Sequence, residues 1–123
     1  MDVEPEERYG RTIGHLPPEI AERIALGMEV DPELPRLFEA IRIHVMEPAT
    51  LDVNTVQLLL FGMMATRLAS APIRYHADSA KRAGSSHQEL YAVAGLALLT
   101  GGTRSYNEAG AAIAAAFRDD GSI

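Results

Sequence analysis

Prolines and glycines divide this 123-residue chain into segments of helical length, and the positions of these residues constrain the fold more than any other feature. The predicted segments open on a proline, which the first helical turn tolerates, or on a side chain that can cap the first turn. No stretch alternates apolar and polar residues as a half-buried strand does. The pattern therefore predicts an all-α fold of about six helices without a sheet. The expected helices cover residues 18–28, 31–47, 52–69, 72–84, 87–99 and 105–118.

Three positions carry specific helix start or stop signals. Asp52 precedes the third expected helix, where its carboxylate can accept a hydrogen bond from the first turn. Ser86 and Glu89 have the spacing of a capping box, and Gly84 is the expected left-handed stop of the preceding helix. Residues 56–65 are apolar on nearly every side, which is typical of a central, buried helix.

The first 15 residues differ from the rest of the chain. Residues 1–15 are acidic, contain two glycines and show little periodicity, so they predict a flexible or docking arm. Residues 16–123 are long enough to bury one core, and we expect a single helical domain there. The second expected helix has one apolar face, made of Leu34, Leu37, Phe38, Ile41 and Val45.

Charge and composition exclude several classes of function. The net charge is −6 and Lys81 is the one lysine, whereas nucleic-acid binding requires clustered positive charge. The absence of cysteine excludes disulfides, thiolate metal sites and thiol catalysis. The most apolar stretches, residues 56–65 and 91–100, are roughly half the length of a membrane-spanning helix. We therefore expect a soluble, cytoplasmic protein.

His76 is the strongest catalytic candidate. It lies in the second turn of the helix expected from Pro72, where the positive end of the helix dipole disfavours the charged imidazole. A neutral imidazole can act as a base. The alternative is a structural histidine that bonds to a backbone carbonyl or to the neighbouring helix. The four histidines of the chain are scattered, with no pair four residues apart, so no metal site is predicted.

Gln57 and His44 are further candidates for a polar site. Gln57 is the one amide within residues 56–65, and a buried amide needs partners. It could line a pocket or hold two helices together. His44 shares a helix side with Ile41 and Val45, so it could face the interior or lie half solvated at the edge of that side.

Four stretches resemble one protein family. They are residues 51–58 (LDVNTVQL), 74–84 (RYHADSAKRAG), 88–90 (QEL) and 101–109 (GGTRSYNEA). Together they resemble the carboxymuconolactone decarboxylase family, which includes the alkylhydroperoxidase D branch, over about two-thirds of the chain. The resemblance implies the helical bundle of that family, but one fold hosts many reactions.

The resemblance also separates the branches of the family. Peroxidase members carry a Cys-x-x-Cys pair that ends four residues before the histidine, and those positions here are Ala69 and Pro72. A disulfide relay needs two thiols, so thiol peroxidase activity is excluded. The family commonly has a glutamate at the position of Gln57, and an amide cannot take part in a Glu–His proton relay.

For a decarboxylase, the resemblance implies acid–base chemistry by His76 without a cofactor. Gln57 would orient a carbonyl, and Arg74 or an arginine of a partner subunit would hold the substrate carboxylate. Arg74 could equally be a solvated residue at a helix start. Tyr106 and Asn107 are candidates for lining the pocket, although Asn107 could be only part of a helix start.

Family members assemble as trimers or hexamers, and we expect a homo-oligomer here. Residues 56–65 and 90–99 are too apolar for a small monomer to cover them on all sides. The expected partners are thus a small carboxylate or lactone substrate and further copies of the chain.

Three functions remain open from the sequence. The first is a cofactor-free lyase that acts on a small cyclic carboxylate or lactone. The second is a catalytically inactive oligomer that binds a small molecule or a protein, which Gln57 favours. The third is a cyclase or isomerase for a larger substrate, since Phe61 and Met64 share a helical face with Gln57. Those two side chains could equally fill the core.

Overall fold

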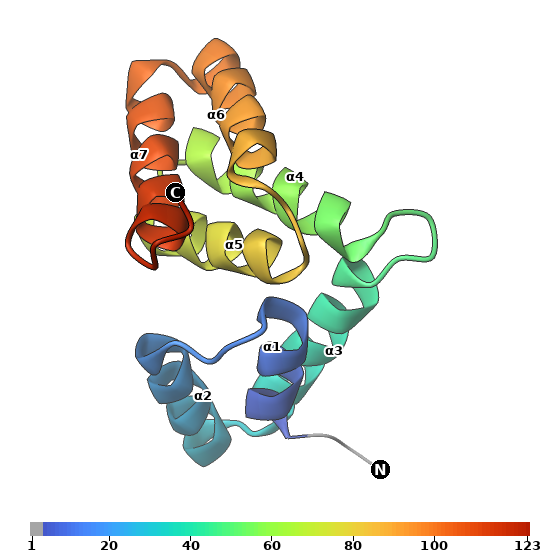
Figure 1. Ribbon diagram of the computed structural model, residues 1–123. Coiled ribbons are helices and arrows are strands. Elements are labelled where there is room, and N and C mark those ends of the chain that lie inside the picture. Colours follow the sequence, from blue (N-terminus) through green and yellow to red (C-terminus); the bar gives the residue numbers. More distant parts are fainter. Residues whose placement is uncertain (1–3) are drawn as a thin grey trace. The chain divides into compact units, whose positions relative to one another are not determined.

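Seven α-helices and one π-helical turn account for the regular structure of residues 4–123, which the computed structural model describes (Figure 1). No strand occurs among these residues. The all-α prediction is confirmed, with one helix more than the six expected. The helices group into two compact units, residues 1–51 and residues 52–123.

The first unit holds α1 (Pro5–Ile13), α2 (Pro18–Val30) and α3 (Glu33–Met46). Both α1 and α2 pack on α3. The sequence predicts a flexible or docking arm over residues 1–15; in the structure, α1 lies within this stretch and buries Tyr9 and Ile13. Periodicity was hard to detect because this helix is short and mostly polar. A proline starts α1, and Gly14 ends it with a left-handed φ of 92°.

An ion cluster forms part of the first unit's interior. Glu39 on α3 is fully buried and accepts a hydrogen bond of 2.6 Å from Arg42. Arg23 on α2 approaches the second carboxylate oxygen of Glu39 at 3.8 Å. The Arg42 guanidinium also lies over the ring of Tyr9, 4.1 Å from its centroid, and burial raises the pKa of that phenol. A buried carboxylate needs such partners, so the cluster fixes which face of α3 points inward.

The second unit holds α4 (Val53–Thr66), α5 (Ser70–Arg82), α6 (His87–Gly101), α7 (Thr103–Ile113) and the π-helical turn Ala114–Arg118. As predicted, α4 is central: it packs on α5, α6 and α7 (Figure 1). A cluster of buried apolar residues spans this unit. Its members are Phe61, Ala65, Ile73, Ala77, Ala80, Leu90, Ala94, Ala97, Ala109, Ala112, Ile113 and Phe117.

The predicted capping signals of this unit are confirmed. Asp52 accepts a hydrogen bond of 2.7 Å from the backbone N–H of Thr55 and so caps α4. Ser86 and Glu89 form a reciprocal capping box at α6, in which the hydrogen bond from the Ser86 N–H lowers the pKa of Glu89. Gly84 takes the left-handed conformation, with φ of 102°. These caps fix where α4 and α6 begin.

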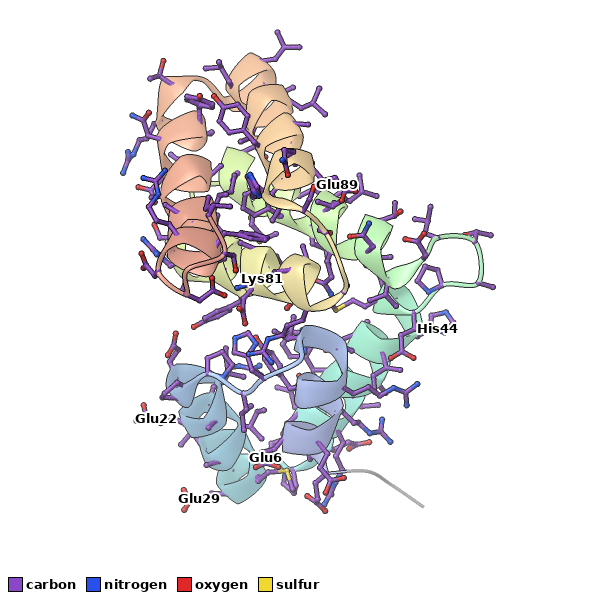
Figure 2. The ribbon with its side chains drawn as sticks, in the orientation of Figure 1. Glu6, Glu22, Glu29, His44, Lys81 and Glu89 are labelled. Atoms are coloured by element: carbon purple, nitrogen blue, oxygen red, sulfur yellow. The ribbon has the colours of Figure 1, made fainter. Side chains whose placement is uncertain are left out.

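Lys81 on α5 contacts and stabilises the C-terminal turn. Its ammonium group donates a hydrogen bond of 2.6 Å to the carbonyl of Ala116 and forms an ion pair with Asp120. It also lies 5.1 Å from the ring centroid of Phe117, which is buried. The one lysine of the chain (Figure 2) therefore joins α5 to the last residues of the unit.

Candidate functional site

Gln57 on α4 and His76 on α5 meet inside the second unit. The Nδ1 atom of His76 lies 2.8 Å from the Oε1 atom of Gln57. A carbonyl oxygen can only accept, so Nδ1 carries the proton and donates it to this bond. In the neutral imidazole, the lone pair is then on Nε2. The contact thus selects one tautomer of His76.

The burial of the two side chains differs. Gln57 is only 2% exposed, whereas His76 is half-buried. The buried amide has the partner that its burial requires, since an unpaired one would cost about 1–3 kcal/mol. The pair therefore has both a structural role, joining α4 to α5, and a partly accessible imidazole.

The position of His76 within its helix differs from the expectation. Because α5 begins at Ser70 rather than Pro72, His76 is in the seventh helical position and no longer close to the N-terminus. The helix dipole acts mainly within the first turn. The contact with Gln57 therefore influences the imidazole more than the N-terminus of α5 does.

The remaining predicted site residues of the second unit lie nearer the surface. Arg74 and Asn107 are exposed, which is the surface position that the sequence left open for both. Tyr106 is half-buried on α7, and its hydroxyl contacts the hydroxyl of Tyr91 on α6. That hydrogen bond raises the pKa of Tyr106. Their roles toward a substrate stay predictions.

His44 lies in the first unit, on α3, and is exposed (Figure 2). Of the two positions that the sequence left open, a solvated one and an interior one, the structure has the solvated one. A role for His44 in substrate binding stays a prediction.

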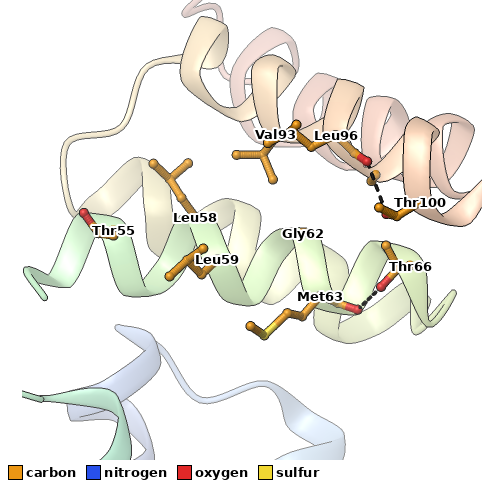
Figure 3. Close-up of a pocket in the computed structure, with 10 residues that line it drawn as sticks. Thr55, Leu58, Leu59, Gly62, Met63, Thr66, Val93, Leu96 and Thr100 are labelled. Carbon is orange, nitrogen blue, oxygen red and sulfur yellow. Dashed lines mark hydrogen bonds between the residues drawn. The ribbon is translucent and has the colours of Figure 1, made fainter.

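A groove between α4 and α6 is a feature that sequence reasoning missed (Figure 3). It has a volume of about 510 Å³. The hydroxyls of Thr66 and Thr100 donate to carbonyls of their own helices, at 2.8 and 3.2 Å, so the lining is mostly apolar. The lining residues are Thr55, Leu58, Leu59, Gly62, Met63, Thr66, Val93, Leu96, Ala97 and Thr100.

The groove and the His76 pair are separate features. Neither Gln57 nor His76 lines the groove, because Gln57 is on another face of α4. The groove offers shape and apolar surface but no group that moves a proton. The candidate for acid–base chemistry is therefore the Gln57–His76 pair and not the groove.

Phe61 and Met64 do not form the adaptable cavity that the sequence left open. Phe61 is fully buried within the apolar cluster, and Met64 packs against that cluster. Both are core residues, which was the plainer of the two interpretations. No group of three His, Asp or Glu side chains that could hold a metal ion occurs in the part of the chain described, residues 4–123. Within the same range, no helix is both long and apolar enough to cross a membrane.

Comparisons with known proteins identify the family. The model of the carboxymuconolactone decarboxylase family matches residues 32–116, which is well over half of the chain. The chain belongs to this family. The matched segment includes α3 to α7 and the positions of both Gln57 and His76.

A solved structure supports the fold. The crystal structure of a candidate carboxymuconolactone decarboxylase from Burkholderia xenovorans LB400 is similar, with a TM-score of 0.78. The match covers 94% of this chain and 87% of that one, at 22% sequence identity. At this identity the likeness establishes the fold alone. No curated protein matches the sequence.

Proposed function

We propose that this family member is a cofactor-free lyase that acts on a small cyclic carboxylate or lactone, with His76 as the acid–base group. The observation that carries the proposal is the 2.8 Å contact between His76 Nδ1 and Gln57 Oε1. It holds a half-buried imidazole in one orientation and one tautomer, as an acid–base catalyst requires. Family membership supports a decarboxylase-like or related reaction.

The hydrogen bond between His76 and Gln57 can form in both protonation states of His76 that a decarboxylation requires. Loss of carbon dioxide breaks a carbon–carbon bond and leaves its electron pair on an enolate. An imidazolium then gives its Nε2 proton to carbon and becomes neutral. Because Nδ1 keeps its proton throughout, the hydrogen bond to Gln57 is present before and after the transfer. Gln57 thus acts as a positioning residue and does not itself move a proton.

Arg74 and Tyr106 are the proposed binding groups. The Arg74 side chain on α5 is exposed, so it is available to a carboxylate; because residues two apart on a helix do not share a face, an arginine of a partner subunit is the alternative. A guanidinium binds a carboxylate through two parallel hydrogen bonds. Asn107 on α7 is a candidate for the rest of the lining, and substrate binding by His44 stays a prediction.

The test is proton exchange and carbon dioxide release on a panel of lactone acids and β-keto acids. The chain, His76→Ala and His87→Ala are incubated in deuterated buffer and the substrates followed by NMR. His87 is the matched control, since it is another half-buried histidine of the second unit and its ring packs on Phe117 at 5.8 Å. We expect deuterium incorporation or carbon dioxide release by the chain and by His87→Ala, and a loss of roughly 100-fold or more in His76→Ala.

A second candidate function is supported by Gln57 itself. Replacing an ionisable group with its amide removes one route for proton transfer, and this favours a catalytically inactive protein that binds a small molecule. A folded parent that transforms no member of the panel but binds one of them, with equal affinity in His76→Ala, would replace the lyase proposal with this one. The cyclase or isomerase alternative would show isomerised product without carbon dioxide.

A further inference from the structure

Helix α3 buries one carboxylate and exposes an apolar face. Its inward-facing residues are Pro35, Glu39 and Met46, and Glu39 is fully buried. Five large apolar side chains lie on the outward side, which we call the outer stripe. They are Leu34 (61% exposed), Leu37 (53%), Phe38 (44%), Ile41 (61%) and Val45 (63%).

The outer stripe cannot be turned inward within its own unit. Rotating α3 would break the 2.6 Å bond between Arg42 and Glu39 and the approach of Arg23 to the same carboxylate. It would also remove the Arg42 guanidinium from the ring of Tyr9. A buried carboxylate without partners is strongly disfavoured. The ion cluster therefore holds the stripe on the outside, where a continuous apolar surface marks an interface.

The spacing of the outer stripe makes it complementary to itself. Along the helix, Leu34, Phe38, Ile41 and Val45 are separated by four, three and four residues. This is the alternation that lines the seam between two packed helices. The order of these spacings is the same from either end of the helix. A second α3 that runs antiparallel therefore presents the same layers in the same order.

We propose that α3 is a self-association surface on which the outer stripes of two copies pack antiparallel across a two-fold axis. In this register Leu34 faces Val45 of the second copy, and Phe38 faces its Ile41. The symmetry repeats both contacts, which gives four apolar layers along a helix of 14 residues. The proposal does not depend on the reaction at His76.

Charge supports a second copy as the occupant. No Asp, Glu, Lys or Arg occupies a position of the outer stripe, and the Arg23 guanidinium, which lies 5.1 Å from the ring centroid of Phe38, is paired with Glu39, so two copies bury no unpaired charge when they pack. The same register brings Leu37 beside His44 of the second copy, and this gives exposed His44 a structural neighbour. A two-fold contact is compatible with the expected hexamer but not with a trimer alone.

The absence of cysteine makes the geometry testable by cross-linking. Leu34→Cys and Val45→Cys variants are oxidised separately and as an equimolar mixture, and the products separated by non-reducing electrophoresis. In the antiparallel register each position faces the other across the seam, so the mixture cross-links and neither variant alone does so. Cross-linking of Leu34→Cys to itself would overturn the antiparallel arrangement. No cross-link in any sample would overturn the interface.

Sedimentation equilibrium tests the surface itself. Ile41→Glu places a carboxylate in a central layer of each copy, and Ala40→Glu places the same charge beside the stripe on the same helix. We expect the parent and Ala40→Glu to share one oligomeric mass, and Ile41→Glu to have half of it at the same concentration. Circular dichroism shows whether each variant is folded. A monomeric parent at micromolar concentration, or a folded Ile41→Glu of unchanged mass, would overturn the proposal.

Discussion

At the scale of single residues, the Gln57–His76 pair shows how an amide changes the chemistry of a histidine. The amide orients the ring through a 2.8 Å contact but carries no charge. A glutamate at the same position would orient the ring in the same way and would also stabilise the imidazolium. A change of the residue at position 57 can thus alter the protonation of His76 without altering the orientation of its ring.

This difference makes the first prediction, for Gln57→Glu. A carboxylate next to the ring favours the charged imidazole, so the pKa of His76 should rise relative to the parent. The imidazolium, which is the proposed proton donor to carbon, then persists to higher pH than in the parent, so the alkaline limb of the activity moves upward. NMR titration of the ring protons measures the shift directly.

The control for this variant is Gln88→Glu. It makes the same change of charge at an exposed position in the first turn of α6. The pKa of His76 in the control should match that in the parent. An unchanged pKa in Gln57→Glu would mean that the two side chains do not meet in solution.

Most of the candidate site could be found from the sequence as a set of residues but not as a geometry. His76 and Gln57 were identified from their residue types and their places in the helices. The contact between them depends on how α4 and α5 pack, which no local pattern encodes. The burial of Glu39 was missed for the same reason, because it depends on how α1 and α2 pack on α3.

At the scale of helices, local signals located the starts that are capped by side chains, together with the proline start of α2, and were less successful at other uncapped starts. Asp52 and Ser86 mark α4 and α6 correctly, since a cap is a property of a few neighbouring residues. The starts of α1 and α5 have no side-chain cap; α1 was not predicted as a helix, and the start of α5 was placed two residues late. The apolar face of α3 was predicted, but the direction in which it points depends on the ion cluster beneath it.

The close approach of α4 and α6 leads to a prediction for Gly62. A Cβ atom at this position would lie 2.8 Å from a methyl group of Val93. Gly62→Ala should therefore destabilise the protein, because overpacking of about 1–3 kcal/mol exceeds the gain of about 0.5–1 kcal/mol in helix propensity. Urea denaturation measures the difference in the free energy of unfolding.

Val93→Ala provides the matched background for this test. With the methyl group removed, only the gain in helix propensity remains, so Gly62→Ala should become stabilising. If Gly62→Ala has the same effect in both backgrounds, the contact between α4 and α6 is not the cause of the destabilisation.

At the scale of the whole molecule, the two units differ in the size of their apolar interiors. All twelve members of the apolar cluster lie in residues 61–117. The large buried apolar side chains of the first unit are Tyr9, Ile13, Ile24 and Met46. Apolar burial supplies most of the resistance to opening. The second unit should thus be the more stable one.

Hydrogen exchange tests this expectation. We predict that amides of α1 to α3 exchange at least tenfold faster than those of α4 to α6, measured on Ile41→Glu so that self-association does not protect α3. Equal exchange in both units would mean that they open together. That result would support the single domain predicted for residues 16–123.

The attachment of the C-terminal turn through Lys81 has a consequence for covalent chemistry. Since Lys81 is the one lysine, it provides the one side-chain amine available for acylation or conjugation. Acylation would neutralise the ammonium group and break its ion pair with Asp120 and its contact with the ring of Phe117. Acylation of the one lysine of this protein, whether enzymatic or by a laboratory reagent, therefore weakens the attachment of the C-terminal turn to α5.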